Sequence, residues 1–312
     1  DVVLIARGRH LEAIRDKGLV VETAAGSTTY QIPAVAGPGE LESRAGDVVL
    51  LTMKSQDTEA ALRELTHTIG AVAPNTPIVC VQNGVANEAM ALRYFAHVYG
   101  VCVMFPATHL EPGVVQIDSA PVPAILDIGR YPGRADEAPD ETARAIAESF
   151  RSAGCHSEPR AEIMPWKYTK LLMNLGNTPQ AILGLGDDET REQIQRIVER
   201  ARAEGQAVLD AAGIAYVSRE QDRERRGDIL RPASVPGRPR GGGSSWQSLT
   251  RGAGSIEADW LAGEIVLLGR LHGVPTPVNA LACRLAGEFA RNGRRPGSLT
   301  PEEFLARLDE PA

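Results

Sequence analysis

The first half of the chain alternates short apolar segments with helix-like segments, and no other feature of the sequence constrains the fold as strongly. Runs rich in valine, isoleucine and leucine occur at residues 2–6, 47–53, 77–84 and 98–105. Further strands are expected within 19–36 and 113–130, and helices at 57–70 and 87–95. Apolar strands that alternate with helices are typical of a parallel sheet covered on both faces. The sequence therefore predicts an α/β domain of the nucleotide-binding type.

The character of the sequence changes near residue 138, after which helical patterns dominate. Helices are expected at 139–154, 163–184, 187–212, 255–272, 277–291 and 301–308. Proline, glycine and arginine interrupt residues 219–245, which are predicted to form an irregular, partly mobile loop. We therefore predict two domains, a cofactor domain at 1–157 and an all-helical substrate domain at 158–312.

Charge and cysteine content argue against several classes of protein. The 312 residues carry 33 basic and 40 acidic side chains, a formal net charge of −7, whereas a protein that binds nucleic acid presents a basic face to the phosphates. No apolar run approaches the roughly 20 residues that a membrane helix needs. The four cysteines form no CxxC pair, so neither a disulfide scaffold nor a metal site is predicted. We expect a cytoplasmic protein with no nucleic acid or membrane partner.

Polar side chains follow three of the predicted strands at the point where each strand ends. Arg7 follows the first run, Lys54 and Gln56 follow the second, and Asn83 follows the third. Ligands of open α/β sheets bind beyond the carboxyl ends of the strands. The alternative is that these residues are polar only because loops lie at the protein surface. An arginine at the end of the second strand of a dinucleotide fold suits the 2′-phosphate of NADP. The alternative for Arg7 is a solvated basic turn.

The segment at 165–180 places three polar side chains at helical spacing. Lys170, Asn174 and Asn177 are separated by four and three residues, so one face of a helix would carry all three. Leucines occupy the other faces, and burying such a polar stripe is costly without a purpose. The alternative is a solvent-exposed face. Only four lysines occur among the 33 basic residues, and lysine, unlike arginine, has a pKa that shifts readily.

A glycine-rich entry at 241–243 leads into a third polar region. Ser245 follows the glycines, and Glu257 lies 12 residues further on in a helix-like run. Trp260 and Leu267 are expected to pack inward. Taken alone, Glu257 is expected at the surface rather than in a site.

Six segments in order give the chain a resemblance to the ketopantoate reductase family, the NADPH-dependent 2-dehydropantoate 2-reductases of pantothenate synthesis. The resemblance runs from residue 1 to about 291. The segments are VVLIARGRHLEAIRDKGL, DVVLLTMKSQDTEAAL, IVCVQNGVANE, LEPGVV, WKYTKLLMNLGN and SSWQSLTRGAGSIEADWLAGEIVLLGRLHGVPTPVN. The resemblance implies a Rossmann domain followed by a helical domain, which agrees with the pattern of predicted elements.

The resemblance also implies roles for individual residues. The cofactor NADP would be bound by Arg7, Lys54, Gln56 and Asn83, with Asn83 at the junction of nicotinamide and substrate. The catalytic residues would be Lys170, which protonates the carbonyl oxygen of a 2-oxo acid, and Glu257, which holds a substrate hydroxyl. The substrate would also contact Asn83, Asn174, Asn177, Thr178 and Ser245. A homodimer is compatible with all of this.

Two departures from the family pattern leave alternatives open. The family has an asparagine before the proline at 179, where this chain has Thr178, so the substrate is either 2-dehydropantoate or another 2-oxo acid or carbonyl compound. Residues 219–243 are long and rich in arginine, and we expect them to close over the anionic cofactor or substrate as a lid. A non-catalytic NADP-binding protein or inactive fragment is the alternative from a different functional class.

The first residues define a further expectation. Residues 2–6 match the family's second strand, so the first strand and the GxGxxG turn are predicted to be missing from the sequence. That turn supplies backbone N–H groups to the pyrophosphate. We therefore expect the chain by itself to bind NADPH weakly.

Overall fold

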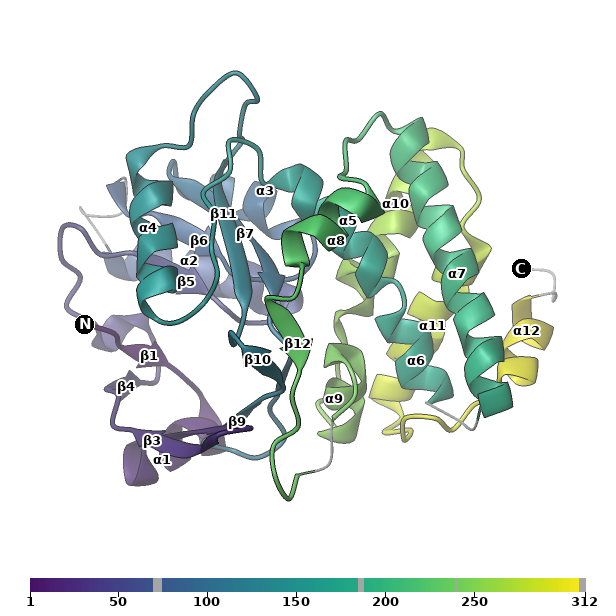
Figure 1. The fold of residues 1–312 in the computed structure, drawn as a ribbon, viewed down its shortest axis with the longest axis horizontal. Coiled ribbons are helices and arrows are strands. Elements are labelled where there is room, and N and C mark those ends of the chain that lie inside the picture. The colour runs from purple at the N-terminus through teal and green to yellow at the C-terminus, as the bar shows by residue number, and fades with distance from the viewer. Residues whose placement is uncertain (70–74, 185–187, 239–240, 309–312) are drawn as a thin grey trace. The chain divides into compact units, whose positions relative to one another are not determined.

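The computed structural model describes residues 1–69, 75–184, 188–238 and 241–308 (Figure 1). Gly70 and Asp187, each at one end of a predicted helix, lie outside these ranges, as do residues 239 and 240 of the predicted lid. The chain forms two compact units, and each is described by itself. The first comprises 1–82, 87–164 and 220–240; the second comprises 83–86, 165–219 and 241–312. The predicted domain limits, 1–157 and 158–312, stay a prediction.

The main sheet of the first unit has the order β11-β7-β6-β5, with β5, β6 and β7 parallel. The prediction of alternating strands and helices is confirmed, but the sheet is mixed, because β11 runs antiparallel to β7. The chain between these two strands forms short strands rather than a crossover helix, so β11 returns in the opposite direction. The elements are β5 (Val49–Leu51), α2 (Thr58–Ile69), β6 (Ile78–Cys80), α3 (Asn87–Leu92), β7 (Val98–Met104), β11 (Ile125–Tyr131) and α4 (Glu141–Ser152).

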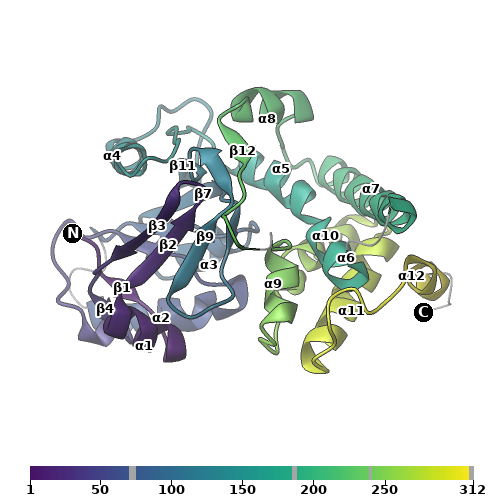
Figure 2. The same cartoon turned by 60° about the horizontal axis from the view of Figure 1, so that its bottom comes forward.

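The remaining strands of the first unit form three further sheets, one with four strands and two with two strands each. The first strand, β1, pairs in parallel with β4, and its apolar side chain Ile5 is 44% exposed. Figure 2 shows β2 between β3 and β9, an arrangement that β8 extends on the other side of β9. The strands predicted within 19–36 and 113–130 are thereby confirmed. The elements are β1 (Leu4–Ile5), α1 (Gly8–Lys17), β2 (Leu19–Thr23), β3 (Gly26–Tyr30), β4 (Ala34–Val35), η1 (Pro38–Glu40), η2 (Ser55–Asp57), β8 (Ala107–Thr108), β9 (Val114–Ile117) and β10 (Ser119–Pro121).

Most of residues 219–238 form regular structure, so the loop prediction is wrong for this part. Helix α8 (Arg219–Arg226) has acidic residues in its first turn and arginines in its last, an order that favours a helix. Strand β12 (Leu230–Pro232) pairs antiparallel with β10. Arg238 then donates to both carboxylate oxygens of Glu22 at 2.9 Å and to Glu111 at 2.6 Å. The segment is thus attached to the first unit, and its closure as a lid stays a prediction.

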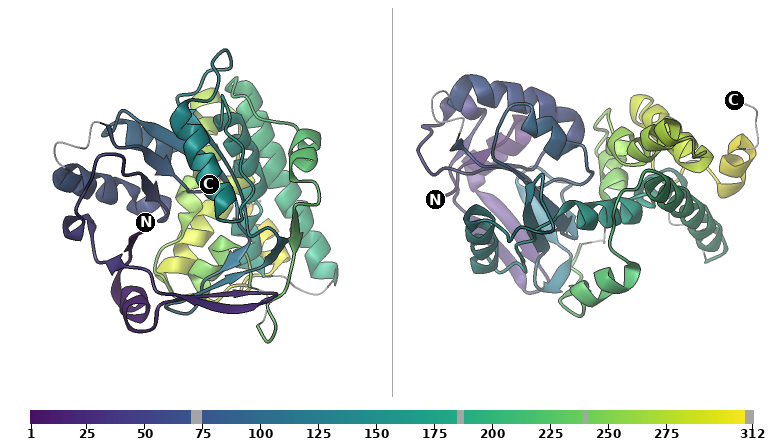
Figure 3. Two further views of the ribbon diagram at one scale, coloured as in Figure 1. Left: turned by 60° about the vertical axis from the view of Figure 1, so that its left-hand side comes forward. Right: turned by 90° about the horizontal axis from the view of Figure 1, so that it is seen from above.

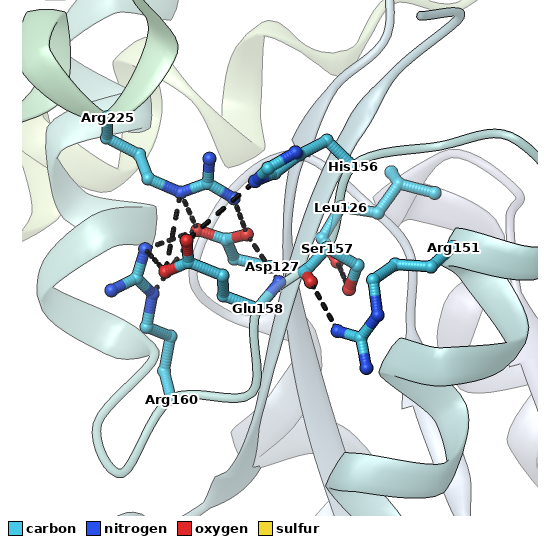
Figure 4. A network of polar contacts seen from close by, with 8 residues as sticks. All are labelled: Leu126, Asp127, Arg151, His156, Ser157, Glu158, Arg160 and Arg225. Carbon is cyan, nitrogen blue, oxygen red and sulfur yellow. Dashed lines mark hydrogen bonds and ion pairs between the residues drawn. The ribbon is translucent and has the colours of Figure 1, made fainter. Parts of the chain in front are cut away.

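A buried ion cluster attaches α8 to the edge strand β11 (Figure 4). Asp127 on β11 accepts from Nη2 of Arg160 at 2.9 Å and from Nε of Arg225 at 2.8 Å, and Nη2 of Arg225 bonds its other oxygen. The backbone N–H of Glu158 also donates to Asp127, at 2.9 Å, and the Glu158 carboxylate lies 2.6 Å from Arg160. The side chains of Asp127 and Arg225 are only 3% and 8% exposed. Each buried charge is therefore compensated by the other, and removing one would leave the other uncompensated.

The regular elements described in the second unit are all helices (Figure 3). Helices α7, α10 and α11 pack against one another, and α6 packs against α9 and α11. The predicted helix at 163–184 is two helices, and the one at 255–272 is a 3₁₀ turn followed by a helix. The elements are α5 (Met164–Asn174), α6 (Asn177–Leu183), α7 (Asp188–Ala211), α9 (Ser244–Thr250), η4 (Glu257–Trp260), α10 (Ala262–His272), α11 (Pro277–Arg291) and α12 (Pro301–Leu308). Among the described residues, no helix has the length and apolar character to cross a bilayer.

Candidate functional site

In the first unit, the predicted cofactor residues stand at the carboxyl ends of two strands. Arg7 follows β1 at the N-cap position of α1, and its side chain is 69% exposed, with Nη2 3.5 Å from the carboxylate of Glu64. Lys54 and Gln56 follow β5 in the same way, Lys54 half-buried and Gln56 exposed. The placement at strand ends agrees with the sequence analysis, and the binding roles stay predictions.

A hydrogen-bonded network of four polar side chains, which the sequence analysis did not predict, lies next to Lys54 and Gln56 in the sequence and at the end of β6. Gln82, at the end of β6, donates to the Met53 carbonyl at 2.9 Å and to Oγ1 of Thr58 at 2.8 Å. Thr58 donates to Oδ1 of Asn87 at 3.0 Å, and Asn87 donates to Oγ of Ser55 at 3.0 Å. These bonds fix the ends of β5 and β6 to each other. The only sequence signal was a set of polar residues directly after two apolar strands.

Helix α1, which begins after Arg7, is attached to the β8–β9 turn by a histidine. Nδ1 of His10 accepts a hydrogen bond from the backbone N–H of Gly113 at 2.9 Å. The His109 ring lies 4.6 Å away, centroid to centroid, and its Nδ1 donates to the Val114 carbonyl at 2.9 Å. Burial, and secondarily the neighbouring His109, lower the pKa of His10 from its ordinary value of 6.5. The neutral ring is therefore the form that the folded unit favours.

Acidification is expected to loosen this attachment. Because the pKa of His10 is lower in the folded state, the folded protein binds fewer protons, and stability falls as pH drops from 6.5 through the lowered pKa. Protonation removes one backbone hydrogen bond, which contributes about 1 kcal/mol. His10→Asn keeps an acceptor oxygen without the titration, so its melting temperature should fall less than that of the parent between pH 7.5 and pH 5.5. The exposed His272 supplies the matched control, His272→Asn, which should melt like the parent; equal acid sensitivity of His10→Asn and the parent would contradict the assignment.

In the second unit, α5 carries Lys170 and Asn174 one turn apart, as the spacing predicted. Lys170 is half-buried and Asn174 is 4% exposed. Nδ2 of Asn174 donates to Oδ1 of Asn83 at 3.0 Å, and Nδ2 of Asn177 donates to Oδ1 of Asn174 at 3.4 Å. Asn177 does not continue the α5 face, because it opens α6 after the break at Gly176. The structure therefore brings the three asparagines together without the single helix that was predicted.

Two polar contacts hold α5 in place beside Lys170. Oγ1 of Thr169 donates to the Val217 carbonyl at 2.9 Å, and the Val217 N–H donates back to the same oxygen at 2.9 Å. Arg202 on α7 donates to the Met173 carbonyl, in the last turn of α5, at 3.3 Å. A cation at this end also complements the helix dipole. The C-terminal half of the helix that carries Lys170 is thus attached to residues that the sequence analysis did not identify.

Two hydroxyl groups in this unit are buried without a hydrogen-bond partner among the described residues. They are Oγ1 of Thr178 on α6 and Oγ of Ser245 on α9, whose residues are 0% and 2% exposed. The two helices pack against each other. A buried hydroxyl that makes no hydrogen bond costs about 1–3 kcal/mol, so such groups usually receive a partner from water or a ligand.

Glu257 is buried, and the prediction that it lies at the surface is wrong. It is 3% exposed and opens η4, which packs against α10 and α11. The 3₁₀ turn ends at Trp260, and the backbone leaves helical geometry at Leu261 before α10 begins, so residues 255–272 share no common helical face. For the same reason Leu267 is 49% exposed rather than packed inward, whereas Trp260 is half-buried as expected. Among the described residues, no cluster of three or more metal-ligating side chains occurs.

Comparison with known proteins gives consistent matches over most of the chain. The family model of ketopantoate reductase PanE/ApbA matches residues 1–133, and that of its C-terminal domain matches residues 162–290. The 2-dehydropantoate 2-reductase of Pyrococcus horikoshii is 28% identical over 293 residues, which cover 90% of this chain and 87% of that protein. The 2-dehydropantoate 2-reductase of Halobacterium salinarum is 27% identical over 299 residues, which cover 93% of this chain and 90% of that protein.

Solved structures show the same fold. The PanE/ApbA family ketopantoate reductase from Ralstonia eutropha JMP134 aligns with a TM-score of 0.72 at 25% identity, over 94% of this chain and 92% of that one. D-mandelate dehydrogenase, in a ternary structure with NADH and anilino(oxo)acetate, aligns with a TM-score of 0.74 at 21% identity, over 94% and 91%. Because the two family models together span both units in order, this chain belongs to the ketopantoate reductase family of oxidoreductases.

Proposed function

We propose that this protein reduces a 2-oxo acid with NADPH, and that the substrate is 2-dehydropantoate. The observation that carries the proposal is the pair of buried hydroxyls, Thr178 and Ser245, which lack a partner among the described residues and lie in the same unit as Lys170 and Glu257. Hydroxyl donors suit a carboxylate, which accepts hydrogen bonds only. The curated relatives named 2-dehydropantoate 2-reductase support the choice of substrate.

The strand ends of the first unit fit a dinucleotide phosphate. Arg7 offers an exposed guanidinium, and a Cβ added to the adjacent Gly8 would meet no atom within 4 Å, so the space beside the arginine is open. A guanidinium binds a phosphate monoester through paired hydrogen bonds, which favours NADPH over NADH. Lys54 and Gln56 of the same unit would complete the contacts, and a cofactor contact by Asn83 stays a prediction. When bound, the nicotinamide supplies a hydride to the keto carbon of the substrate.

Residues of this chain would then stabilise the negative charge that develops on the carbonyl oxygen during the reduction. The carbonyl oxygen becomes an alkoxide, and Lys170 stabilises that charge and donates a proton to the oxygen. Glu257 accepts a hydrogen bond from the terminal hydroxyl of the substrate, which fixes the acid in the site. Asn83, Asn174, Asn177, Thr178 and Ser245 were predicted as further substrate contacts.

A second candidate is a reductase for another 2-oxo acid, and Thr178 is the observation that favours it. A threonine places its hydroxyl closer to the backbone than an asparagine places its amide, and it adds a methyl group. A solved structure of the same fold, D-mandelate dehydrogenase, holds NADH and anilino(oxo)acetate, so NADH and a bulkier oxo acid are the outcomes to include in a test. A homodimer and a cytoplasmic location stay predictions.

Oxidation of NADPH and NADH should be measured with 2-dehydropantoate and with the same 2-oxo acid lacking the terminal hydroxyl. We expect the highest kcat/KM with NADPH and 2-dehydropantoate. Glu257→Gln should lower it by about tenfold for 2-dehydropantoate and far less for the analogue, since the neutral amide oxygen accepts a weaker hydrogen bond from the substrate hydroxyl than the carboxylate does. Glu189→Gln, an exposed change on α7, is the matched control. Binding of NADPH without turnover of any 2-oxo acid would favour the non-catalytic alternative.

A further inference from the structure

A carboxylate of α2 lies beside the arginine that is predicted to bind the cofactor. Oε2 of Glu64 is 3.5 Å from Nη2 of Arg7, and the two side chains are 43% and 69% exposed. Neither side chain has another salt-bridge partner among the residues that the structure describes. A guanidinium carries several N–H donors in a planar fork, so it can contact a carboxylate and still offer an open edge to a second anion.

The backbone of the turn between β4 and η1 limits where this carboxylate can lie. A Cβ added to Gly37 would come within 2.8 Å of Oε1 of Glu64. A Cβ added to Gly39 would lie 3.8 Å from Cγ2 of Thr68, which is one helical turn further along α2. The turn therefore packs on α2, and the missing side chain of Gly37 leaves the space that the carboxylate of Glu64 occupies. One oxygen of Glu64 faces this turn, and the other faces Arg7.

The same turn is attached to α1, the helix that has the arginine at its N-cap. Nε of Arg15 donates to the Ala34 carbonyl at 2.9 Å, and Nη2 of Arg15 donates to Oε2 of Glu40 at 3.2 Å. Oε1 of Glu40 accepts a hydrogen bond from the Ala36 N–H at 3.1 Å. Helix α1, the turn and α2 are thus joined by contacts other than the ion pair itself. The acid and the arginine are therefore neighbours because of the fold, and not only because of their mutual attraction.

We propose that Glu64 is a specificity-determining residue that reduces the preference of Arg7 for NADPH over NADH without abolishing it. A phosphate monoester carries a charge of about −1.5 to −2 at pH 7, so the 2′-phosphate competes with the carboxylate for the guanidinium and is repelled by it. The 2′-hydroxyl of NADH is a hydrogen-bond donor, and the same carboxylate can accept from it. This inference rests on the cofactor role of Arg7 in the proposed function.

Removal of the charge on Glu64 provides the direct test. Glu64→Gln should lower the Kd of NADPH about fivefold and raise the Kd of NADH about twofold or less, both measured by isothermal titration calorimetry. Glu64→Asp keeps the charge but withdraws it from the arginine, so its ratio of the two Kd values should lie between those of the parent and Glu64→Gln. Glu148→Gln removes an exposed acid that pairs with Arg151 on α4, and this matched control should leave both Kd values unchanged.

The sign of the change separates this role from the alternative, in which Glu64 orients Arg7 for the phosphate. An orienting carboxylate would make Glu64→Gln weaken the binding of NADPH, and either that result or an unchanged ratio of the two Kd values would overturn the proposal. Exposed ion pairs contribute little to stability, so the melting temperature of Glu64→Gln should stay within about 2 °C of the parent.

Binding and turnover distinguish this inference from the proposed function. If both dinucleotides bind with the expected changes in Kd but no 2-oxo acid is reduced, the reductase function fails and the role of Glu64 stands. If the parent protein reduces a 2-oxo acid and Glu64→Gln does not tighten the binding of NADPH, the role of Glu64 fails and the reductase function stands. If the parent protein binds neither dinucleotide, the inference fails together with the cofactor role of Arg7.

Discussion

Replacing Lys170 with alanine is expected to lower kcat for the 2-oxo acid about a thousandfold while NADPH still binds. Reduction turns a neutral carbonyl into an alkoxide, and removal of the group that stabilises and protonates it forfeits both general acid catalysis and electrostatic stabilisation, each worth about 10²-fold or more. Lys170 is half-buried near the end of a helix whose neighbours Thr169 and Met173 are fixed by Val217 and Arg202. The loss should appear in kcat under saturating substrate, measured by NADPH oxidation.

Two further variants make this result specific to the chemistry. Lys170→Arg restores a cation that does not give up its proton at neutral pH, so part of the lost kcat should return. Lys17→Ala removes an exposed lysine at the end of α1 and should leave kcat unchanged. Retention of kcat within threefold in Lys170→Ala would show that this lysine is not the catalytic group.

The spacing of Lys170, Asn174 and Asn177 identified residues that do lie together, but it assigned them to a helix that does not exist. The break has a cause that is visible in the sequence. Pro179 has no backbone N–H and its ring conflicts with a carbonyl four residues earlier, so it is tolerated only in the first turn of a helix. A new helix therefore starts at Asn177 and puts Pro179 in its first turn.

The burial of Glu257 and the attachment of residues 220–238 depend on contacts that one sequence does not display. Glu257 is buried because η4 packs against α10 and α11, which is a property of the folded unit and not of local periodicity. Arg225 and Arg238 were expected to face an anionic ligand. Their partners are acidic residues of this chain, such as Asp127 and Glu22, which lie 98 and 216 positions away. Charge pairing at such separations leaves no local pattern.

The buried cluster around Asp127 gives the second large expected effect, a loss of stability in Asp127→Ala of about 3–5 kcal/mol. Removing one member of a buried pair leaves the other charge without compensation. Here the loss would leave Arg225, with its side chain 8% exposed, beside the like charge of Arg160, and Glu158 would be the remaining acid near both. The midpoint of thermal unfolding, followed by circular dichroism, should fall by about 10 °C.

An exposed pair in the same unit supplies the matched control, because it differs in burial and not in chemistry. The side chains of Arg134 and Asp136 are 64% and 71% exposed at an N–O distance of 3.2 Å, so Asp136→Ala should change stability by less than about 0.5 kcal/mol. The loss of stability in Arg225→Ala is expected to lie between those of Asp127→Ala and Asp136→Ala, since Asp127 would keep Arg160 at 2.9 Å and the N–H of Glu158.

All three tryptophans lie in the second unit, so their fluorescence follows that unit while circular dichroism follows both. Helix α8 begins where the chain returns from the second unit to the first. Since Arg225 joins α8 to Asp127 of β11, loss of the cluster should detach α8 from β11. Equal destabilisation by Asp127→Ala and Asp136→Ala would show that burial of the cluster adds nothing to its strength.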